Sequence, residues 1–249
     1  MKKKIYAIIA TNHNPKKIKD LTDTIKGIMG SDLYILSVND IAIVASDIPS
    51  AEQISEKELA LDFSRVIEEL SQHVTLLPVR FGTFIKSNEI INQLLINHYD
   101  SFLTNLQKVE NKCEFGLKVL YNCNKFSAIK KLKIVAEEDE LSKYFSTNTI
   151  HTNYLFEKIK KNKQEDTLSK YVEQLIEDIG QHLTQINPDS KFKKIITNKI
   201  LIDAVFLVKK NKKDEFIQAI CAFNEQHDDL QFLLTGPWPP YSFVDIVIK

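Results

Sequence analysis

The sequence predicts an α+β protein of two domains, the first of them ferredoxin-like with the element order βαββαβ. The chain has 249 residues, of which 43% are hydrophobic, enough for two domains with cores of their own. In the first 86 residues, apolar runs of strand length alternate with stretches of helical periodicity, and much the same order recurs in the second half. We therefore expect an N-terminal ferredoxin-like domain over residues 1–86 and a C-terminal α+β domain over residues 87–249.

The elements of the first domain follow from apolar patterns and turn residues. Asn39-Asp40 suits a two-residue hairpin turn between two short apolar runs. Ser50 or Ser55 is placed to cap the second helix. Two helices on one face of an antiparallel sheet then give the ferredoxin-like plait. The expected strands are Lys3–Ala10, Leu33–Val38, Ile41–Ser46 and Val74–Pro78, and the expected helices are Lys16–Met29 and one that ends near Leu70.

The second domain is expected to combine long helices with a second sheet. Without a charged helical insertion at residues 125–165, its order is again βαββαβ, so we hypothesise a second plait that arose by internal duplication. The apolar stripe of the helix at 167–186 is typical of a core, although a projecting helical hairpin there would be a candidate for partner contact. The expected helices are Ser87–Val109, Thr167–Ile186 and Asp214–Gln226, and the expected strands are Cys113–Tyr121, Phe192–Thr197, Ile200–Val208, Leu230–Thr235 and Phe243–Ile248, with a turn at Asn198-Lys199.

Composition argues against several classes of function. Basic and acidic residues number 33 each, which gives no electrostatic case for nucleic acid or an anionic membrane surface. No stretch is long and apolar enough to span a membrane, and the apolar run after the N-terminal lysines is too short for a signal peptide. Three cysteines, odd in number and without metal-ligand spacing, favour a reducing cytoplasm. The six histidines are scattered and no phosphate-binding or nucleophile motif occurs, so we expect no catalytic residue, metal or cofactor.

The stretch LLPVRFGTF joins the two expected domains and carries the first candidate site. Pro78 ends or edges the strand, and Gly82 permits a backbone conformation that side chains disfavour. Arg80 is a permanent charge next to Phe81. We interpret Arg80 as a structural residue paired with Glu114, with an anchor in a protein interface as the alternative.

The second candidate site is the proline- and aromatic-rich stretch near the C-terminus. Three prolines hold an extended backbone around the only tryptophan, so its aromatic side chains could be presented as rigid contacts. Alternatively, Trp238 fills a groove between the domains. The candidate residues of this stretch are Gly236, Pro237, Trp238, Pro239, Pro240, Tyr241 and Phe243.

Three blocks of the sequence resemble the gas vesicle protein GvpF/GvpL family, and they occur in the family's order. They are PVRFGT with the helix after it, EFGLKVLY, which carries Glu114 and Lys118, and LTGPWPPYSFV. The resemblance implies two α+β domains, the first a modified ferredoxin-like fold. It further implies a non-enzymatic role in gas vesicle formation, at the vesicle in the cytoplasm, with the hydrophobic shell protein GvpA and accessory gas vesicle proteins as partners.

A second functional class remains open at this stage. Tandem ferredoxin-like domains also occur in small-molecule sensors and enzymes that bind a ligand between their sheets. That alternative predicts a deep, polar-lined pocket between the halves and a melting temperature that rises with ligand.

Overall fold

A computed structural model describes residues 2–11, 15–48, 55–121, 166, 168–195 and 200–244. The chain forms two compact units, Met1–Glu114 together with Pro237–Lys249, and Phe115–Gly236. The predicted division after residue 86 differs from these units, because the helices after residue 87 and the C-terminal tail group with the first unit. The expected insertion at 125–165 lies outside the described residues. Both units are mixtures of helix and antiparallel sheet, which confirms the predicted α+β class.

The first unit contains most of the elements expected in the N-terminal half. Its strands are β1 (Lys2–Ala10), β2 (Leu33–Val38), β3 (Ile41–Ile48), β4 (Leu76–Pro78) and β5 (Phe84–Ile85). Its helices are α1 (Pro15–Thr24), η1 (Ile28–Gly30), α2 (Glu56–His73), α3 (Asn88–Asn97), α4 (Tyr99–Val109) and, in the tail, η3 (Tyr241–Phe243).

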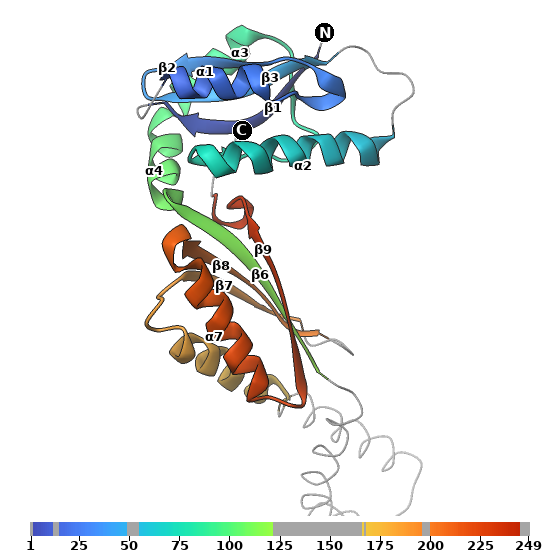
Figure 1. Ribbon diagram of the computed structural model, residues 1–249, viewed down its shortest axis with the longest axis vertical. Helices are drawn as coiled ribbons and strands as arrows, with labels where there is room; N and C mark the ends of the chain where they lie inside the picture. Colours follow the sequence, from blue (N-terminus) through green and yellow to red (C-terminus); the bar gives the residue numbers. More distant parts are fainter. Residues whose placement is uncertain are drawn as a thin grey trace, which may run out of the picture. The chain divides into compact units, whose positions relative to one another are not determined.

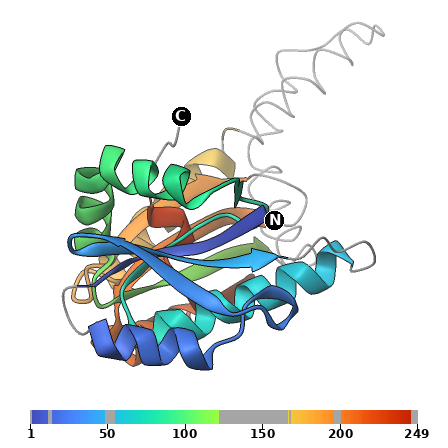
Figure 2. The ribbon, with the colours of Figure 1, turned by 90° about the horizontal axis from the view of Figure 1, so that it is seen from above.

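The sheet of the first unit has the strand order β2-β3-β1-β4, and β5 also pairs with β1. Figure 1 labels β1, β2 and β3 of this sheet. β1 runs antiparallel to β3, β4 and β5. α1 and α2 lie along one face of this sheet and α3 and α4 along the other, as Figure 2 shows. Tyr6, Val44, Phe63 and Leu70 belong to the buried cluster between the sheet and α1 and α2.

Three helical or strand predictions need correction. The single helix expected over Ser87–Val109 is two helices that break at His98 (φ −118°, ψ 17°), because α3 packs on β2 and β3 while α4 packs on β1 and β4. The first helix ends at Thr24 rather than Met29. The strand expected from Phe243 begins instead with the 3₁₀ turn η3, and the tail beyond Val244 lies outside the described residues.

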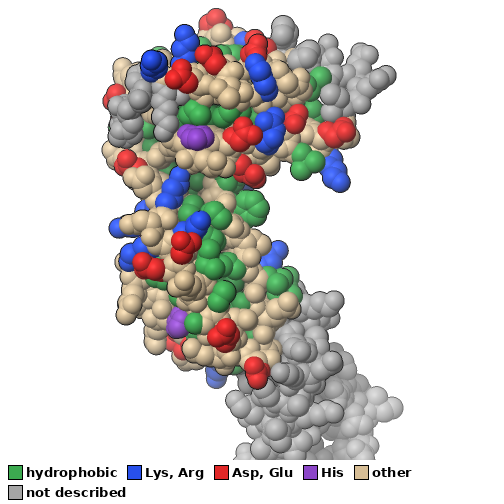
Figure 3. Space-filling view, viewed as in Figure 1, with side chains coloured by type: hydrophobic (Ala, Val, Ile, Leu, Met, Phe, Trp, Pro, Cys, Tyr) green, Lys and Arg blue, Asp and Glu red, His purple; other side chains and the backbone are tan. Residues whose placement is uncertain are grey.

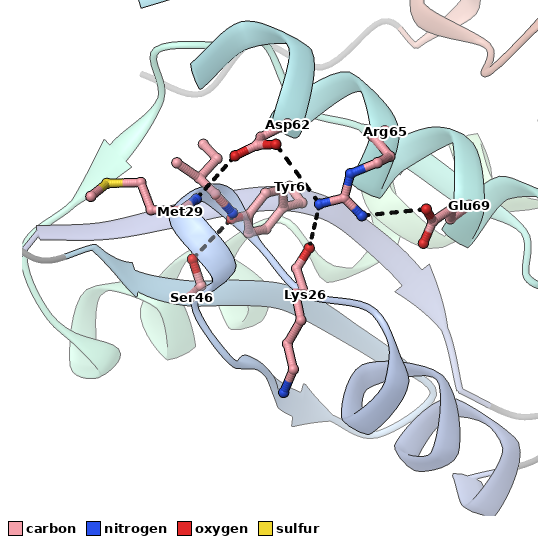
Figure 4. A network of polar contacts seen from close by, with 8 residues as sticks. Tyr6, Lys26, Met29, Ser46, Asp62, Arg65 and Glu69 are labelled. Atoms are coloured by element: carbon pink, nitrogen blue, oxygen red, sulfur yellow. Dashed lines mark hydrogen bonds and ion pairs between the residues drawn. The ribbon is translucent and has the colours of Figure 1, made fainter. Parts of the chain in front are cut away.

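A polar network fixes the loop that follows α1 (Figure 4). Met29 has φ 58°, a conformation that L-residues seldom adopt, and its N–H donates to Asp62 Oδ2 at 3.1 Å. The N–H of Ile28 donates to the buried hydroxyl of Tyr6 at 2.8 Å. Arg65 bonds the carbonyl of Lys26 at 3.0 Å. These contacts from β1 and α2 end α1 early, and a local apolar pattern does not show them.

The second unit has a four-stranded sheet, with the order β7-β8-β6-β9. On β6, Cys113, Phe115, Leu117 and Val119 are buried on one face, while on the other face Lys118 is exposed and Glu114 is buried. The elements are β6 (Lys112–Tyr121), a helix over residues 168–182, β7 (Asp189–Lys194), β8 (Ile200–Lys209), η2 (Lys210–Lys212), α7 (Lys213–Glu225) and β9 (Leu230–Trp238). No helix in the described ranges is long and apolar enough to cross a membrane.

Candidate functional site

The C-terminal tail is anchored to the first unit by its own prolines and aromatic residues. Pro239 and Pro240 are buried, and the side chain of Phe243 is only 2% exposed. The short turn η3 is closed by a bond from the N–H of Phe243 to the carbonyl of Pro240 at 3.3 Å. Because proline fixes φ, the backbone of this segment is restricted before any further contact is made.

Glu114 holds the tail in place. The N–H of Ser242 donates to Glu114 Oε2 at 2.7 Å, and its hydroxyl donates to Glu114 Oε1 at 2.6 Å. Glu114 is 6% exposed, so both bonds form largely out of water, where hydrogen bonds to a charged group are strong. The predicted ion pair between Arg80 and Glu114 is wrong. Among the described residues, the partner of Glu114 is Ser242, and Arg80 is exposed.

Two aromatic side chains remain outside this anchor. Trp238 is 45% exposed and Tyr241 is 41% exposed. Trp238 directly precedes the two buried prolines, and Tyr241 directly follows them. Partial burial and, to a lesser extent, the negative charge of Glu68 on α2 raise the pKa of the Tyr241 phenol to about 12. Tyr241 is therefore a neutral hydrogen-bond donor at physiological pH. The tail thus presents two broad, rigid rings to solvent on a fixed backbone.

The corner at Arg80–Thr83 forms a tight turn at the end of β4. The N–H of Val79 donates to the carbonyl of Tyr6 at 2.9 Å, and both the N–H and the hydroxyl of Thr83 donate to the carbonyl of Arg80. Gly82 has φ +92°, the left-handed region in which glycine is favoured. Phe81 is half-buried and packs its ring edge-on against Phe63 of α2 at 5.5 Å.

Lys4 on β1 is the residue that sequence reasoning missed. It is 0% exposed, and its ammonium lies 4.4 Å from the ring centre of Phe63, 4.6 Å from that of Phe81 and 4.8 Å from that of Phe84. Its Nζ has no hydrogen-bond partner among the described residues. Burial lowers the pKa of Lys4 to about 8. The sequence signal was weak, since three lysines in a row start the chain and nothing local tells which one points inward.

Two of the candidate residues belong to the second unit. Lys118 is exposed on β6. Gly236 has φ +116° and ends the second unit just before the anchored tail. Near it, the hydroxyl of Thr235 donates to the carbonyl of Gly116 at 3.3 Å, and a Cβ on Gly116 would lie 2.8 Å from that hydroxyl oxygen. The remaining candidates, Arg80, Phe81, Gly82, Glu114, Pro237, Trp238, Pro239, Pro240, Tyr241 and Phe243, lie in the first unit.

The described residues thus define a two-unit α+β protein whose most elaborate feature is an anchored aromatic tail. On the face in Figure 3, cationic and anionic side chains are interspersed. Within the described ranges, no three His, Cys, Asp or Glu side chains group closely enough to hold a metal ion. Rigid aromatic groups on a fixed backbone are suited to protein contact.

Comparison with known proteins identifies the family. The profile described as "Gas vesicle synthesis protein GvpL/GvpF" matches residues 4–245, and the chain belongs to this family. Gas vesicle protein F1 of Halobacterium salinarum is 23% identical, over 92% of this chain and 90% of the relative. Gas vesicle protein F of a Streptomyces species is 22% identical, over 97% of this chain and 98% of the relative.

Solved structures agree in fold. The crystal structure of GvpF from Anabaena sp. PCC7120 superposes with a TM-score of 0.81 at 17% identity and covers 99% of each chain. That of GvpF from Microcystis aeruginosa gives a TM-score of 0.74 at 18% identity, over 98% of this chain and 99% of the other. Family membership supports a role in gas vesicles, as the sequence blocks predicted.

Proposed function

We propose that this chain is a non-enzymatic assembly or minor structural protein of gas vesicles that binds the hydrophobic shell protein GvpA and accessory gas vesicle proteins. The family match over residues 4–245 is the observation that carries the proposal. In the cell, the protein acts in the cytoplasm and at the vesicle. A shell subunit with a large apolar surface needs a protein that covers this surface before assembly.

The tail residues Trp238 and Tyr241 are proposed as the anchors for the shell protein. Tryptophan and tyrosine dominate binding energy at many interfaces, and both rings are exposed here despite their size. Glu114 and the buried prolines hold the backbone beneath them, so little ordering is required on binding. Arg80 is exposed and belongs to PVRFGT, another of the three blocks that resemble the family. It is proposed as a further contact rather than a structural ion-pair residue.

The finer description of the fold belongs to the same proposal. We assign the first unit to the ferredoxin-like class, since β1-α1-β2-β3-α2-β4 with the sheet order β2-β3-β1-β4 is the expected plait. The second sheet, β7-β8-β6-β9, places its strands in the equivalent order when β6 to β9 are matched with β1 to β4. Equivalent order supports the hypothesis of internal duplication.

The test is co-purification of the shell protein with the full chain, followed by affinity measurement on variants. Trp238→Ala and Tyr241→Ala are each expected to weaken binding about tenfold or more, the usual effect of removing an aromatic anchor. Leu61→Ala is the matched control, because Leu61 is a large hydrophobic side chain of the same unit and is 62% exposed. It should change affinity less than twofold.

Two outcomes separate the parts of the proposal. If the shell protein and accessory proteins all fail to co-purify with the wild-type chain, the binding function is wrong. If they bind but folded Trp238→Ala, Tyr241→Ala and Arg80→Ala proteins bind as well as wild type, the function stands and the assignment of the site is wrong.

A further inference from the structure

The ammonium of Lys4 is closed off from solvent by a short segment that follows β4. Phe81 and Phe84 cover it from this segment, and Phe63 covers it from α2. Aromatic faces attract a cation, but they do not replace the three hydrogen bonds that water gives to an ammonium group. Since Nζ has no partner among the described residues, the closed arrangement holds a charge whose hydrogen-bonding capacity is unused.

Among the residues that the structure describes, no charged group shifts the pKa of Lys4, which burial alone lowers. Its register partner on β3 is Ser46, whose hydroxyl is 2.9 Å from that of Tyr6, and burial raises the pKa of Tyr6. On α2, Asp62 is engaged with Met29 and Arg65. Two further charges near Lys4 in the sequence and sheet, Lys3 and Asp47, bond one another at 2.8 Å. Arg80, next to Phe81, is exposed.

The covering segment is joined to β1 by a short strand pairing. β5 has two residues, which pair with β1 at Lys3↔Ile85 and Lys4↔Phe84. Gly82 precedes it with φ +92°, and the helix α3 begins at Asn88. β4 pairs separately with Ala7–Ile9, and the N–H of Val79 bonds the carbonyl of Tyr6, so residues 80–86 can leave β1 while these bonds are kept.

From this arrangement we propose that residues 80–86 form a hinged strap, and that its opening uncovers a binding site for an apolar partner segment that carries a carboxylate. When the strap opens, Phe81 and Phe84 leave with it, and the open site consists of the Phe63 ring on α2 beside the Lys4 ammonium. The Phe63 ring provides apolar contact area, and a carboxylate gives Lys4 the hydrogen-bond partner that it lacks. This site is distinct from the anchored tail and goes beyond the proposed function.

Hydrogen exchange of the full chain at pH 7 tests the strap. The amides of Phe84 and Ile85 are expected to exchange by local opening, at least tenfold faster than those of Ile8 and Ile9 in the same strand system. Lys4→Met removes the unpartnered charge with little change in volume and should slow exchange at Phe84 and Ile85 about tenfold or more. Lys86→Met, at an exposed position just after β5, is the matched control. In this variant the amides of Phe84 and Ile85 should exchange at the wild-type rate.

The apolar anion 8-anilinonaphthalene-1-sulfonate is the probe for the open site. Wild type and Lys86→Met should bind it saturably at pH 7, and Lys4→Met should bind it at least fivefold more weakly. Phe84→Ala, which removes one covering ring, should exchange faster at Ile85, so the strap can be tested even if Lys4→Met does not fold. If the amide of Ile85 exchanges no faster than those of Ile8 and Ile9, the proposed strap is wrong. If Lys4→Met and wild type bind the dye with equal affinity, the proposed site is wrong.

Discussion

The bond pair between Glu114 and Ser242 is predicted to decide whether the C-terminal tail stays attached to the first unit. Glu114→Gln keeps the size of the side chain and one carbonyl oxygen but replaces the second oxygen by an NH₂ group. That group would face either the N–H of Ser242, where the bond is lost, or its hydroxyl, which would then have to accept instead of donate; these two groups now donate at 2.7 and 2.6 Å. In either orientation, no remaining bond involves a charge.

The expected magnitude follows from the type of bond. Hydrogen bonds to a charged group contribute about 1.5–3 kcal/mol each. Glu114→Gln should therefore reduce the free energy of tail attachment by about 2–3 kcal/mol, given that Glu114 is only 6% exposed. Ser242→Ala removes the hydroxyl bond alone and should cost about 1.5–2 kcal/mol.

The chain provides its own reporter for this measurement. Trp238 is the only tryptophan and lies four residues before Ser242. In urea, its fluorescence is expected to change with far-UV circular dichroism in the wild type. In Glu114→Gln, the fluorescence change should come at lower urea than the circular dichroism change, because the tail detaches while the sheets remain folded.

A double-mutant cycle supplies the refuting result. If the two residues act through their mutual bonds, Glu114→Gln and Ser242→Ala together should cost about 1 kcal/mol less than the sum of the single changes. Additive costs, or coincident fluorescence and circular dichroism transitions in Glu114→Gln, would contradict the idea that this pair anchors the tail.

Three further changes have defined directions. Lys4→Met should raise the free energy of unfolding by about 2–3 kcal/mol at pH 7, since a pKa lowered from 10.5 to about 8 marks a charge that is less favourable in the folded state. This wild-type penalty is fully present below pH 8 and disappears as pH rises toward 10.5, so the difference between the two proteins in urea titrations should shrink over that range; a constant difference contradicts the assignment. Gly82→Ala should destabilise the protein by about 1 kcal/mol or more, because Gly82 has a positive φ. Gly180→Ala, on a helix with open space around it, should stabilise the protein by about 0.5–1 kcal/mol. Melting temperatures that shift in the same direction would contradict this contrast. Ser55→Ala breaks the capping box with Glu58 and should lower stability by about 1 kcal/mol, while Ser71→Ala within the same helix should have a smaller effect.

The parts of the fold that could be predicted are those set by local patterns. β2 has the predicted bounds, and β3 begins where expected, after a turn at Asn39, which has φ 51°. Ser55, one of two predicted caps, forms a full capping box at the start of α2. The strand expected at Cys113–Tyr121 is present as β6, and its alternate apolar residues share one buried face because side chains point to opposite sides of a strand.

The parts that could not be predicted depend on distant contacts. Nothing in the sequence near His98 ends a helix, and the break between α3 and α4 arises because the two helices pack on different strands. The tail was recognised as a special stretch, but its anchor was not, since Glu114 and Ser242 are separated by 128 positions. Sequence reasoning paired Glu114 with Arg80, whereas in the structure Glu114 bonds Ser242.

The block PVRFG shows how a correct motif can direct attention to the wrong side chain. Arg80, a permanent charge between two apolar residues, was the obvious candidate for a buried charge, yet it is exposed and Phe81 beside it covers a different cation. Lys4 points inward because β1 is in register with β3, where its partner is the buried Ser46. Strand register is a tertiary property, so no run of three lysines can reveal it. β5 pairs with β1 at Lys4↔Phe84, so the strap places Phe81 and Phe84 over the Lys4 ammonium. In the proposal above, the stability of the closed strap depends on the charge of Lys4.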